Sequence, residues 1–366
     1  MQSELFVGER LQLAREFRGL TQRALGDKVA ASHALISLCE TGKKKQPAVD
    51  LVEAISSVLG FEPEFFYRPL SDVFHEDECS FRHRRTTPER QKAQIRAHAT
   101  LIGIVLERLG HLVKFPSFNL PTIPAKTYEE IEAAAEQCRR FWGLGLESPI
   151  LQPGRVLERA GVIIVSHVAA SKKVDAFSRC GRTAVIFLNQ ATLSSSRWVF
   201  DIAHECAHLV MHRGMQTGTL ETEQAADRFA SAFLMPRTAF SREFRASPFG
   251  WKHIFNLKRR WMTSAAAIVR RAYDLGLVGA VVYRQAFKYM SSRGWRSKGE
   301  PAEPHFQEPE LLQMALKALG TKVGLSLDTL CEELGFTHET FFDVTGVPVP
   351  PERVKERSVI PLRGAR

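Results

Sequence analysis

The stretch Trp198–His212, with the sequence WVFDIAHECAHLVMH, decides the organisation of the central part of this chain. It has a helical pattern and contains His-Glu-X-X-His at residues 204–208. Because four residues make about one turn of helix, His204 and His208 project from the same face and can share one tetrahedral metal ion. Glu205 lies one position further round, where it can act as general base on a metal-bound water without being a ligand.

A second helical stretch, Glu221–Leu234, supplies the remaining ligand. Glu223 follows His208 by fifteen residues, which leaves room for a turn and a returning helix, so it is the expected third ligand. Asp227, one turn after Glu223, is expected to accept the outer N–H of a ligand histidine and to fix its tautomer. Glu221 is the alternative third ligand, but the spacing Glu-X-X-X-Asp favours Glu223. Two imidazoles and one carboxylate suit one zinc ion with a fourth position open.

Three neighbours of this motif are expected to have other roles. A metzincin-type site would place a third histidine ten residues after His204, but position 214 is glycine. His212 lies eight residues after His204, and we expect it at the helix end or at the rim of the site. Cys206 points away from the ligand face and is expected in the core, whereas Arg197 is expected in a structural salt bridge.

The sequence around these helices predicts a domain of mixed structure. Two apolar, β-branched runs, Val162–Val165 and Ala184–Leu188, are typical of strands in a small sheet. Helices are predicted at Tyr128–Phe141 and near Gly154–Ala160, and the two metal-site helices end before Pro236.

The order His-Glu-X-X-His and then Glu-X-X-X-Asp resembles that of the gluzincin metallopeptidases, whose second motif supplies a glutamate ligand and an outer aspartate. More narrowly, the chain resembles the ImmA/IrrE family of metallopeptidase-like proteins from about Tyr128 to Arg237. The segments that carry the resemblance are FWGLGLESPI (141–150), Gly161–Val165, Asp175–Ser178, Val185–Asn189, Arg197 with HECAHLVMH (204–212), and EQAADRFASAFLMP (223–236). The resemblance implies a zinc endopeptidase domain that acts on a repressor-like protein.

Short helical periodicities fill Gly8–Tyr67. One helix is predicted at Arg10–Phe17, a second begins after the cap residue Thr21, and a third, Ser32–Cys39, follows a turn at Ala30 and Ala31 with Ser32 as its N-cap. The residues spaced to pack the second and third helices together are Leu25, Val29, Leu35, Ile36 and Cys39. The residues left facing outward are His33, Ala34 and Ser37.

This pattern, LAREFRGLTQRALGDKVAASHALISLCETGKKKQP at residues 13–47, resembles the phage-repressor-like XRE helix-turn-helix family. The resemblance implies double-stranded DNA as a partner, with the third helix in the major groove and Gln22 on a backbone phosphate. The lysine run after Gly42 would neutralise further phosphates. The expected DNA-contacting residues are Gln22, Ser32, His33, Ser37, Lys43, Lys44 and Lys45.

Two features depart from the pattern of that family. The usual turn glycine is replaced by Ala30, and neither Ala34 nor Leu38 can donate a hydrogen bond to a base. Direct readout of bases would therefore depend on His33, Ser37 and methyl contacts. The alternative interpretation is a small helical module that serves only for dimerisation or docking.

Composition indicates a globular protein of the cytoplasm. Hydrophobic residues make up 44% and charged residues 25% of the 366 residues. No apolar run is long enough to span a membrane, and the N-terminus lacks the features of a secretory signal. The 6 cysteines are scattered without CxxC pairs, which indicates reduced thiols rather than a disulfide framework.

The net charge of +10 is concentrated between Ser241 and Glu300, where 13 Lys/Arg stand against 3 Asp/Glu. Within this block, His253–Ala272 predicts two short helices, with Ser264 near the N-cap of the second, in the manner of another helix-turn-helix. Two interpretations are open: a helical packing module, as in similar ImmA/IrrE fusions, which we favour, and direct contact with DNA. Leu325–Val344 repeats the short-helix pattern and is expected to be structural.

The sequence therefore predicts an α+β protein that is predominantly α-helical. Its predicted parts are a helix-turn-helix domain (1–70), a linker with a connecting helix (71–127), a gluzincin-like zinc domain with a small sheet (128–237), and a helical C-terminal region with a helix-turn-helix-like segment (238–366). The predicted function is a homodimeric DNA-binding transcriptional regulator whose zinc endopeptidase cleaves a repressor-like partner. The alternative is a non-cleaving repressor or antitoxin-like regulator whose metal site is structural or senses a ligand.

Overall fold

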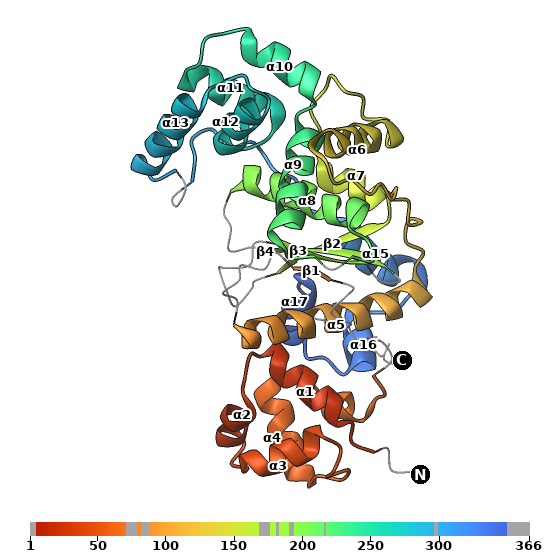
Figure 1. The fold of residues 1–366 in the computed structure, drawn as a ribbon. Coiled ribbons are helices and arrows are strands. Elements are labelled where there is room, and N and C mark those ends of the chain that lie inside the picture. The colour runs from red at the N-terminus through yellow and green to blue at the C-terminus, as the bar shows by residue number, and fades with distance from the viewer. Residues whose placement is uncertain are drawn as a thin grey trace, which may run out of the picture.

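The fold is predominantly helical, with one small sheet near its centre (Figure 1). The computed structural model describes residues 5–70, 79–81, 88–167, 176–180, 183–189, 194–215, 217–295 and 299–349. This arrangement confirms the predicted α+β class. No helix in these described ranges is both long enough and apolar enough to cross a membrane.

The N-terminal part forms a small helical domain around a helix-turn-helix. Its elements are α1 (Gly8–Phe17), α2 (Gln22–Lys28), α3 (His33–Glu40), α4 (Val49–Leu59) and the 3-10 helix η1 (Pro63–Tyr67). The predicted caps are confirmed, because the side chains of Thr21 and Ser32 accept backbone N–H groups at the starts of α2 and α3. Between the two helices Ala30 has a φ of 52°, a left-handed conformation that closes the turn without glycine.

The sheet has four strands among the described residues, in the order β1-β3-β4-β2. The strands are β1 (Cys79–Phe81), β2 (Val162–His167), β3 (Ala176–Cys180) and β4 (Ala184–Asn189). β4 runs parallel to β2 and antiparallel to β3, and β1 adds antiparallel to the outer edge of β3. The strand β1 corrects the sequence analysis, which predicted only linker in this segment. Three residues carry no period-2 pattern, and their strand conformation comes from pairing with β3.

The two faces of the sheet belong to different hydrophobic cores. Ile186 faces a core shared with α8 (Ser195–Met211) and α9 (Leu220–Leu234). The next residue, Phe187, faces a core shared with α5 (Glu89–Leu112) and the N-terminal domain. Because successive strand residues point to opposite faces, the apolar runs noted in the sequence are buried on both sides. The sheet thus positions the metal-site helices on one face and the DNA-binding domain beyond the other.

The metal-site face carries two further helices, and beyond it a helical group forms the end of the molecule opposite the helix-turn-helix (Figure 1). These elements are α6 (Tyr128–Phe141), α7 (Pro153–Arg159), α10 (Arg237–Arg245), α11 (Trp251–Trp261), α12 (Ala265–Asp274) and α13 (Ala280–Ser292). A buried ion pair anchors this helical group to α6. The Arg271 guanidinium of α12 donates two hydrogen bonds to the Glu132 carboxylate of α6, with Nη2 2.8 Å from Oε2.

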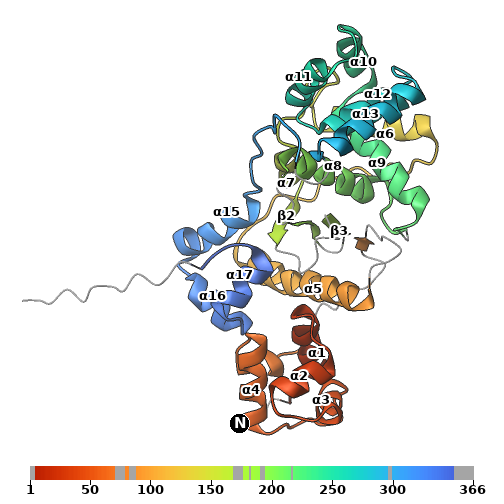
Figure 2. The ribbon, with the colours of Figure 1, turned by 90° about the vertical axis from the view of Figure 1, so that its left-hand side faces the viewer.

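The last part of the chain returns to the centre and the DNA-binding end (Figure 2). Its elements are α15 (Leu311–Ala318), the π-helical turn η3 (Leu319–Val323), α16 (Leu327–Leu334) and α17 (His338–Thr345). The Arg18 guanidinium of α1 lies 2.5 Å from Asp343 Oδ2 of α17, and Phe61 and Phe336 form an antiparallel bridge. The Thr337 hydroxyl donates to the Gly60 carbonyl at 2.8 Å. The C-terminal helices therefore dock the N-terminal domain onto the rest of the protein.

Candidate metal centre and DNA-binding helix

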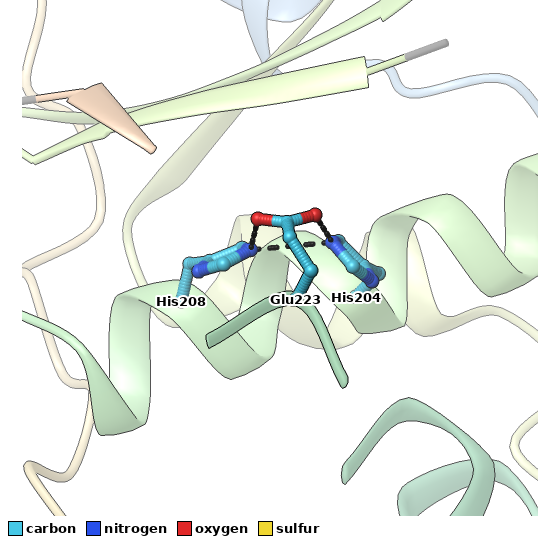
Figure 3. Close-up of side chains that lie close together, drawn as sticks. All are labelled: His204, His208 and Glu223. Atoms are coloured by element: carbon cyan, nitrogen blue, oxygen red, sulfur yellow. Dashed lines mark hydrogen bonds and ion pairs between the residues drawn. The ribbon is translucent and has the colours of Figure 1, made fainter. Parts of the chain in front are cut away.

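Three side chains converge between α8 and α9. His204 and His208 extend from one face of α8, and Glu223 reaches them from the first turn of α9 (Figure 3). The two histidine Nε2 atoms are 3.2 Å apart. Each lies 3.4 Å from a different oxygen of the Glu223 carboxylate. Three potential ligands, two nitrogens and one carboxylate, thus point at one position.

The spacing of this triad fits a zinc ion. Zinc bonds to histidine nitrogen and carboxylate oxygen are about 2.0–2.2 Å long, so two ligand atoms of a tetrahedral site lie about 3.3–3.5 Å apart. The observed separations of 3.2 Å and 3.4 Å are close to this value. Two histidines and one carboxylate are also a ligand set of catalytic zinc sites. In such a site three protein ligands leave the fourth coordination position free. Glu221, the alternative ligand, is exposed and lies outside the triad.

Each histidine of the triad has a hydrogen-bond partner behind it. Asp227 Oδ1 lies 2.8 Å from His204 Nδ1. His212 Nδ1 lies 3.0 Å from His208 Nδ1, and the His212 ring is buried. When Nε2 of His208 serves as a metal ligand, the ring proton is on Nδ1 and can be donated to His212. The expectation of a helix-end residue is confirmed, because His212 is the C-cap of α8. Its buried contact with His208 was not foreseen, and its position one turn after His208 was the available signal.

The charges of the cluster are set by burial and by these contacts. Burial by itself would lower the pKa of His204, but hydrogen bonds with Asp227 and Glu223 raise that pKa to about 10. Burial would raise the pKa of Glu223, but hydrogen bonds with His204 and His208 lower it to about 2. Burial, and next the neighbouring His208, lower the pKa of His212 to about 4. The Glu223 carboxylate is thus held ionised, as a metal ligand requires.

Glu205 lies next to the triad without joining it. Its side chain is 1% exposed, and burial raises its pKa against the opposing effects of His208 and His204. The Ser178 hydroxyl of β3 lies beside Glu205 and also opposes the rise. A carboxyl with a raised pKa near a metal centre is suited to accept a proton and to release it again.

The remaining residues near the motif fall outside the triad. Cys206 is buried in the core behind α8, as expected from its position on the helix. Arg197 lies near the start of α8 with an exposed side chain. Asp175, part of the family resemblance, lies outside the described residues.

The first turns of α3 face solvent at the outer end of the N-terminal domain. His33 and Ala34 are exposed, Ser37 is half-buried, and Leu38 is 42% exposed. Lys43, Lys44 and Lys45 are exposed after α3. The start of α3 and the lysine run are thus accessible to solvent, as residues that contact DNA must be.

Two of the predicted contact residues are engaged within the domain. The Ser32 hydroxyl accepts the Leu35 N–H as the cap of α3. The Gln22 amide donates to Glu40 Oε2 at 2.7 Å, and the same buried carboxylate is paired with Arg15. To contact a DNA phosphate, the Gln22 amide would have to bond to the phosphate and to Glu40 at the same time.

Sequence reasoning missed a hollow of about 450 Å³ beside this surface. It lies between the starts of α2 and α3 and the first turns of α5, and its lining includes Gln22, Arg23, His33, Arg90 and Arg96. No local pattern could reveal it, because α5 follows the helix-turn-helix only after an intervening segment.

Several cations of the Ser241–Glu300 block are neutralised within the fold. Lys258 is fully buried, with Nζ 2.9 Å from Glu300 Oε2 and 2.6 Å from Glu303 Oε1. Others form ion pairs with acids near or far in the sequence: Arg242 with Glu147, Arg260 with Glu243, Arg270 with Asp274, and Arg271 with Glu132. The local charge excess therefore overstates the positive surface of this region.

Fold and site together define a helix-turn-helix protein with a metallopeptidase-like domain. Residues 7–64 match the family model described as a helix-turn-helix domain, and residues 157–273 match the peptidase-family model described as an IrrE N-terminal-like domain. A search of curated proteins found no match. The chain is a fusion of a helix-turn-helix domain with an IrrE-like peptidase domain, which confirms the resemblance seen in the sequence.

Proposed function

We propose that this protein is a DNA-binding transcriptional regulator whose second domain is a zinc-dependent endopeptidase acting on a repressor-like protein. The helix-turn-helix supports binding to double-stranded DNA, and its exposed α3 is the element that would enter the major groove. By analogy with other helix-turn-helix proteins, we further propose a homodimer that reads two half-sites about one helical turn apart.

The observation that carries the peptidase proposal is the geometry of His204, His208 and Glu223. Their ligand atoms are spaced as a tetrahedral zinc site requires, and Glu205 stands beside them without being part of the triad. A purely structural zinc site has four protein ligands, whereas three ligands with an adjacent carboxylate are typical of a hydrolytic site. The described residues offer three ligands here.

Zinc would be held by Nε2 of His204, Nε2 of His208 and the Glu223 carboxylate, and when bound it supplies a Lewis acid that lowers the pKa of water. Glu205 would take the proton of the attacking water and pass it to the leaving amine. Asp227 would keep the proton of His204 on Nδ1, and His212 would do the same for His208. This division of roles predicts different phenotypes for the ligands and the base.

The test combines metal content with proteolysis of fluorescein-labelled casein. Glu205→Gln should retain near-stoichiometric zinc and lose hydrolysis. His208→Ala should lose the metal, and Asp227→Asn should weaken metal affinity by about 10–100-fold. Glu223→Ala should weaken it strongly, whereas the matched change Glu221→Ala, at an exposed glutamate two residues earlier, should have no effect. Equal zinc in the Glu223→Ala and wild-type proteins would refute the ligand assignment.

The alternative is a regulator that does not cleave and whose metal is structural or senses a ligand. It is favoured by the burial of the site, since His204, Glu205 and His208 are each only 1–2% exposed. The two functions differ in cells. If regulation of the target promoter survives Glu205→Gln but fails in His208→Ala, the metal is structural. If Glu205→Gln alone abolishes the response while DNA binding stays intact, hydrolysis is the output.

A further inference from the structure

The edge of the sheet nearest the metal-site helix is occupied by the segment that follows the DNA-binding domain. β1 pairs antiparallel with β3 in the register Cys79–Arg179, Ser80–Ser178 and Phe81–Phe177. Without β1, β3 would be the outer strand of the sheet, with a row of open backbone N–H and C=O groups. The occupant of this edge therefore comes from the polypeptide that connects the two functional parts of the chain.

This edge is also the part of the sheet closest to the proposed general base. Ala176 of β3 belongs to the core shared with α8, and Ser178, on the same face of the strand, lies beside Glu205. In the close-up, the short orange strand lies on the same side of the triad as the sheet (Figure 3). The register places the backbone of Ser80 directly opposite Ser178. An extended peptide is thus held next to the strand that borders the proposed catalytic residues.

Extended peptides are commonly bound by adding a strand to an open sheet edge, where main-chain hydrogen bonds give affinity with little dependence on side chains. β1 has this conformation and this kind of pairing. We propose that β1 is an intramolecular substrate, and that the metal centre hydrolyses a peptide bond within Cys79–Phe81. This inference rests on the proposed peptidase function of the same site.

The reaction needs only water as a second reactant. The water oxygen forms a bond to the carbonyl carbon of the linker, and the carbon–nitrogen bond of that peptide breaks. Glu205 accepts a proton from the water and transfers it to the departing nitrogen. The products are a new carboxylate at the end of the DNA-binding fragment and a new amino group at the start of the remainder.

Cleavage within β1 would leave the DNA-binding domain attached only by non-covalent contacts. These include the ion pair of Arg18 with Asp343, the bridge of Phe61 with Phe336, and the hydrogen bond of Thr337 to Gly60. Contacts of this kind permit slow dissociation, whereas the intact chain keeps both parts together. Cleavage of the linker would thus uncouple DNA binding from the rest of the protein.

The experiment uses the full chain, purified with a chelator and then supplied with zinc, and follows its intact mass over time. We expect two fragments whose masses sum to that of the chain plus one water, with the new ends within residues 79–81. Glu205→Gln loaded with zinc should remain whole. Because hydrolysis in cis is unimolecular, the first-order rate should not change over a hundredfold dilution; a rate proportional to protein concentration would overturn the intramolecular arrangement.

A pair of linker variants tests the role of the strand. Ser80→Pro fixes φ and removes a backbone N–H, so it should slow self-cleavage by at least about tenfold, whereas Ser80→Ala should match the wild type. Labelled casein is assayed in parallel. Casein hydrolysis without self-cleavage would overturn this inference and leave the peptidase intact. Loss of both reactions in the zinc-loaded wild type would refute the peptidase function itself.

Discussion

The chain contains two helix pairs with the same local geometry and opposite surroundings. In both, a non-glycine residue closes the turn in the left-handed conformation, with φ of 52° at Ala30 and 56° at Met262. In both, a serine two residues later caps the second helix, Ser32 for α3 and Ser264 for α12. Yet α3 turns its first residues to solvent, whereas α12 buries five of its ten residues, including Arg271.

The difference shows that a helix-turn-helix is defined locally but becomes a DNA-binding surface only through its packing. The positive charges follow the same rule: Lys43–Lys45 are exposed, while Lys258 and Arg271 are buried against carboxylates. The burial of the second pair supports the interpretation favoured from the sequence, a packing module. Four predictions test or refine this comparison.

The largest expected effect is on stability and concerns the buried pair that anchors α12. Arg271→Ala would leave the buried Glu132 carboxylate with only the half-exposed Arg237, whose Nε lies 3.7 Å from Oε2, and should cost about 3 kcal/mol, the lower end of the usual range for a broken buried pair. The neighbouring Arg270 is a matched control, because its side chain is 52% exposed and pairs one helical turn away with Asp274. Arg270→Ala should cost less than about 1 kcal/mol. Calorimetric unfolding that shifts equally for the two variants would contradict the packing role of α12.

The second prediction compares the exposed charges of the two regions. Replacing Lys43, Lys44 and Lys45 with alanine should flatten the salt dependence of DNA binding and weaken it roughly a hundredfold at about 0.15 M salt, alike for operator and random duplex. The control removes three exposed cations in and next to α13, Arg284, Lys288 and Arg293, and should leave affinity unchanged. A salt slope reduced equally by both triple variants would assign DNA contact to the second region.

The third prediction concerns base readout by α3. His33→Ala combined with Ser37→Ala should lower the preference for operator over random DNA by about 1–3 kcal/mol, because these are the α3 side chains able to make polar contacts with base edges. Affinity for random duplex should stay nearly constant, since phosphate contacts are retained. Competition binding measures the ratio, and an unchanged ratio would remove α3 as the reading element.

The fourth and smallest effect is on the pH dependence of stability, through the contact between the N-terminal domain and α5. His98 of α5 contacts Phe17, and its Nε2 lies 2.8 Å from the Val344 carbonyl. Burial lowers the pKa of His98 to about 4, although the Val344 carbonyl and Asp343 oppose this. The unfolded chain then binds the proton more tightly, so stability is complete above about pH 6.5 and falls as the pH drops toward 4.

At pH 5.5 the loss from His98 alone should be about 1 kcal/mol relative to pH 7. In His98→Phe, which keeps an aromatic ring but cannot be protonated, the dependence on pH between 7 and 5.5 should be weaker by this amount. Denaturant midpoints at the two pH values provide the measurement. Equal pH dependence in both proteins would show that His98 is not the titrating group.

Much of the candidate site could be predicted because its residues lie within single helices. The one-turn spacing of His204 and His208 follows from helix geometry, and Asp227 and Glu223 share a face for the same reason. The caps at Thr21, Ser32 and Ser264 are equally local, since each serves a backbone group three residues away. Such features depend on a few neighbouring residues, so the sequence by itself determined them.

Only the tertiary structure decided which surfaces are left for function. The pairing of β1 with β3 and the contact of Arg18 with Asp343, 325 residues apart, involve partners that no local pattern connects. The sequence showed a helix-turn-helix-like pattern in α12 and a linker in front of α5. Long-range packing buried α12, and pairing with β3 turned part of the linker into a strand. The physical reason is that the free energy of burial and of strand pairing depends on the neighbours that the complete fold brings together.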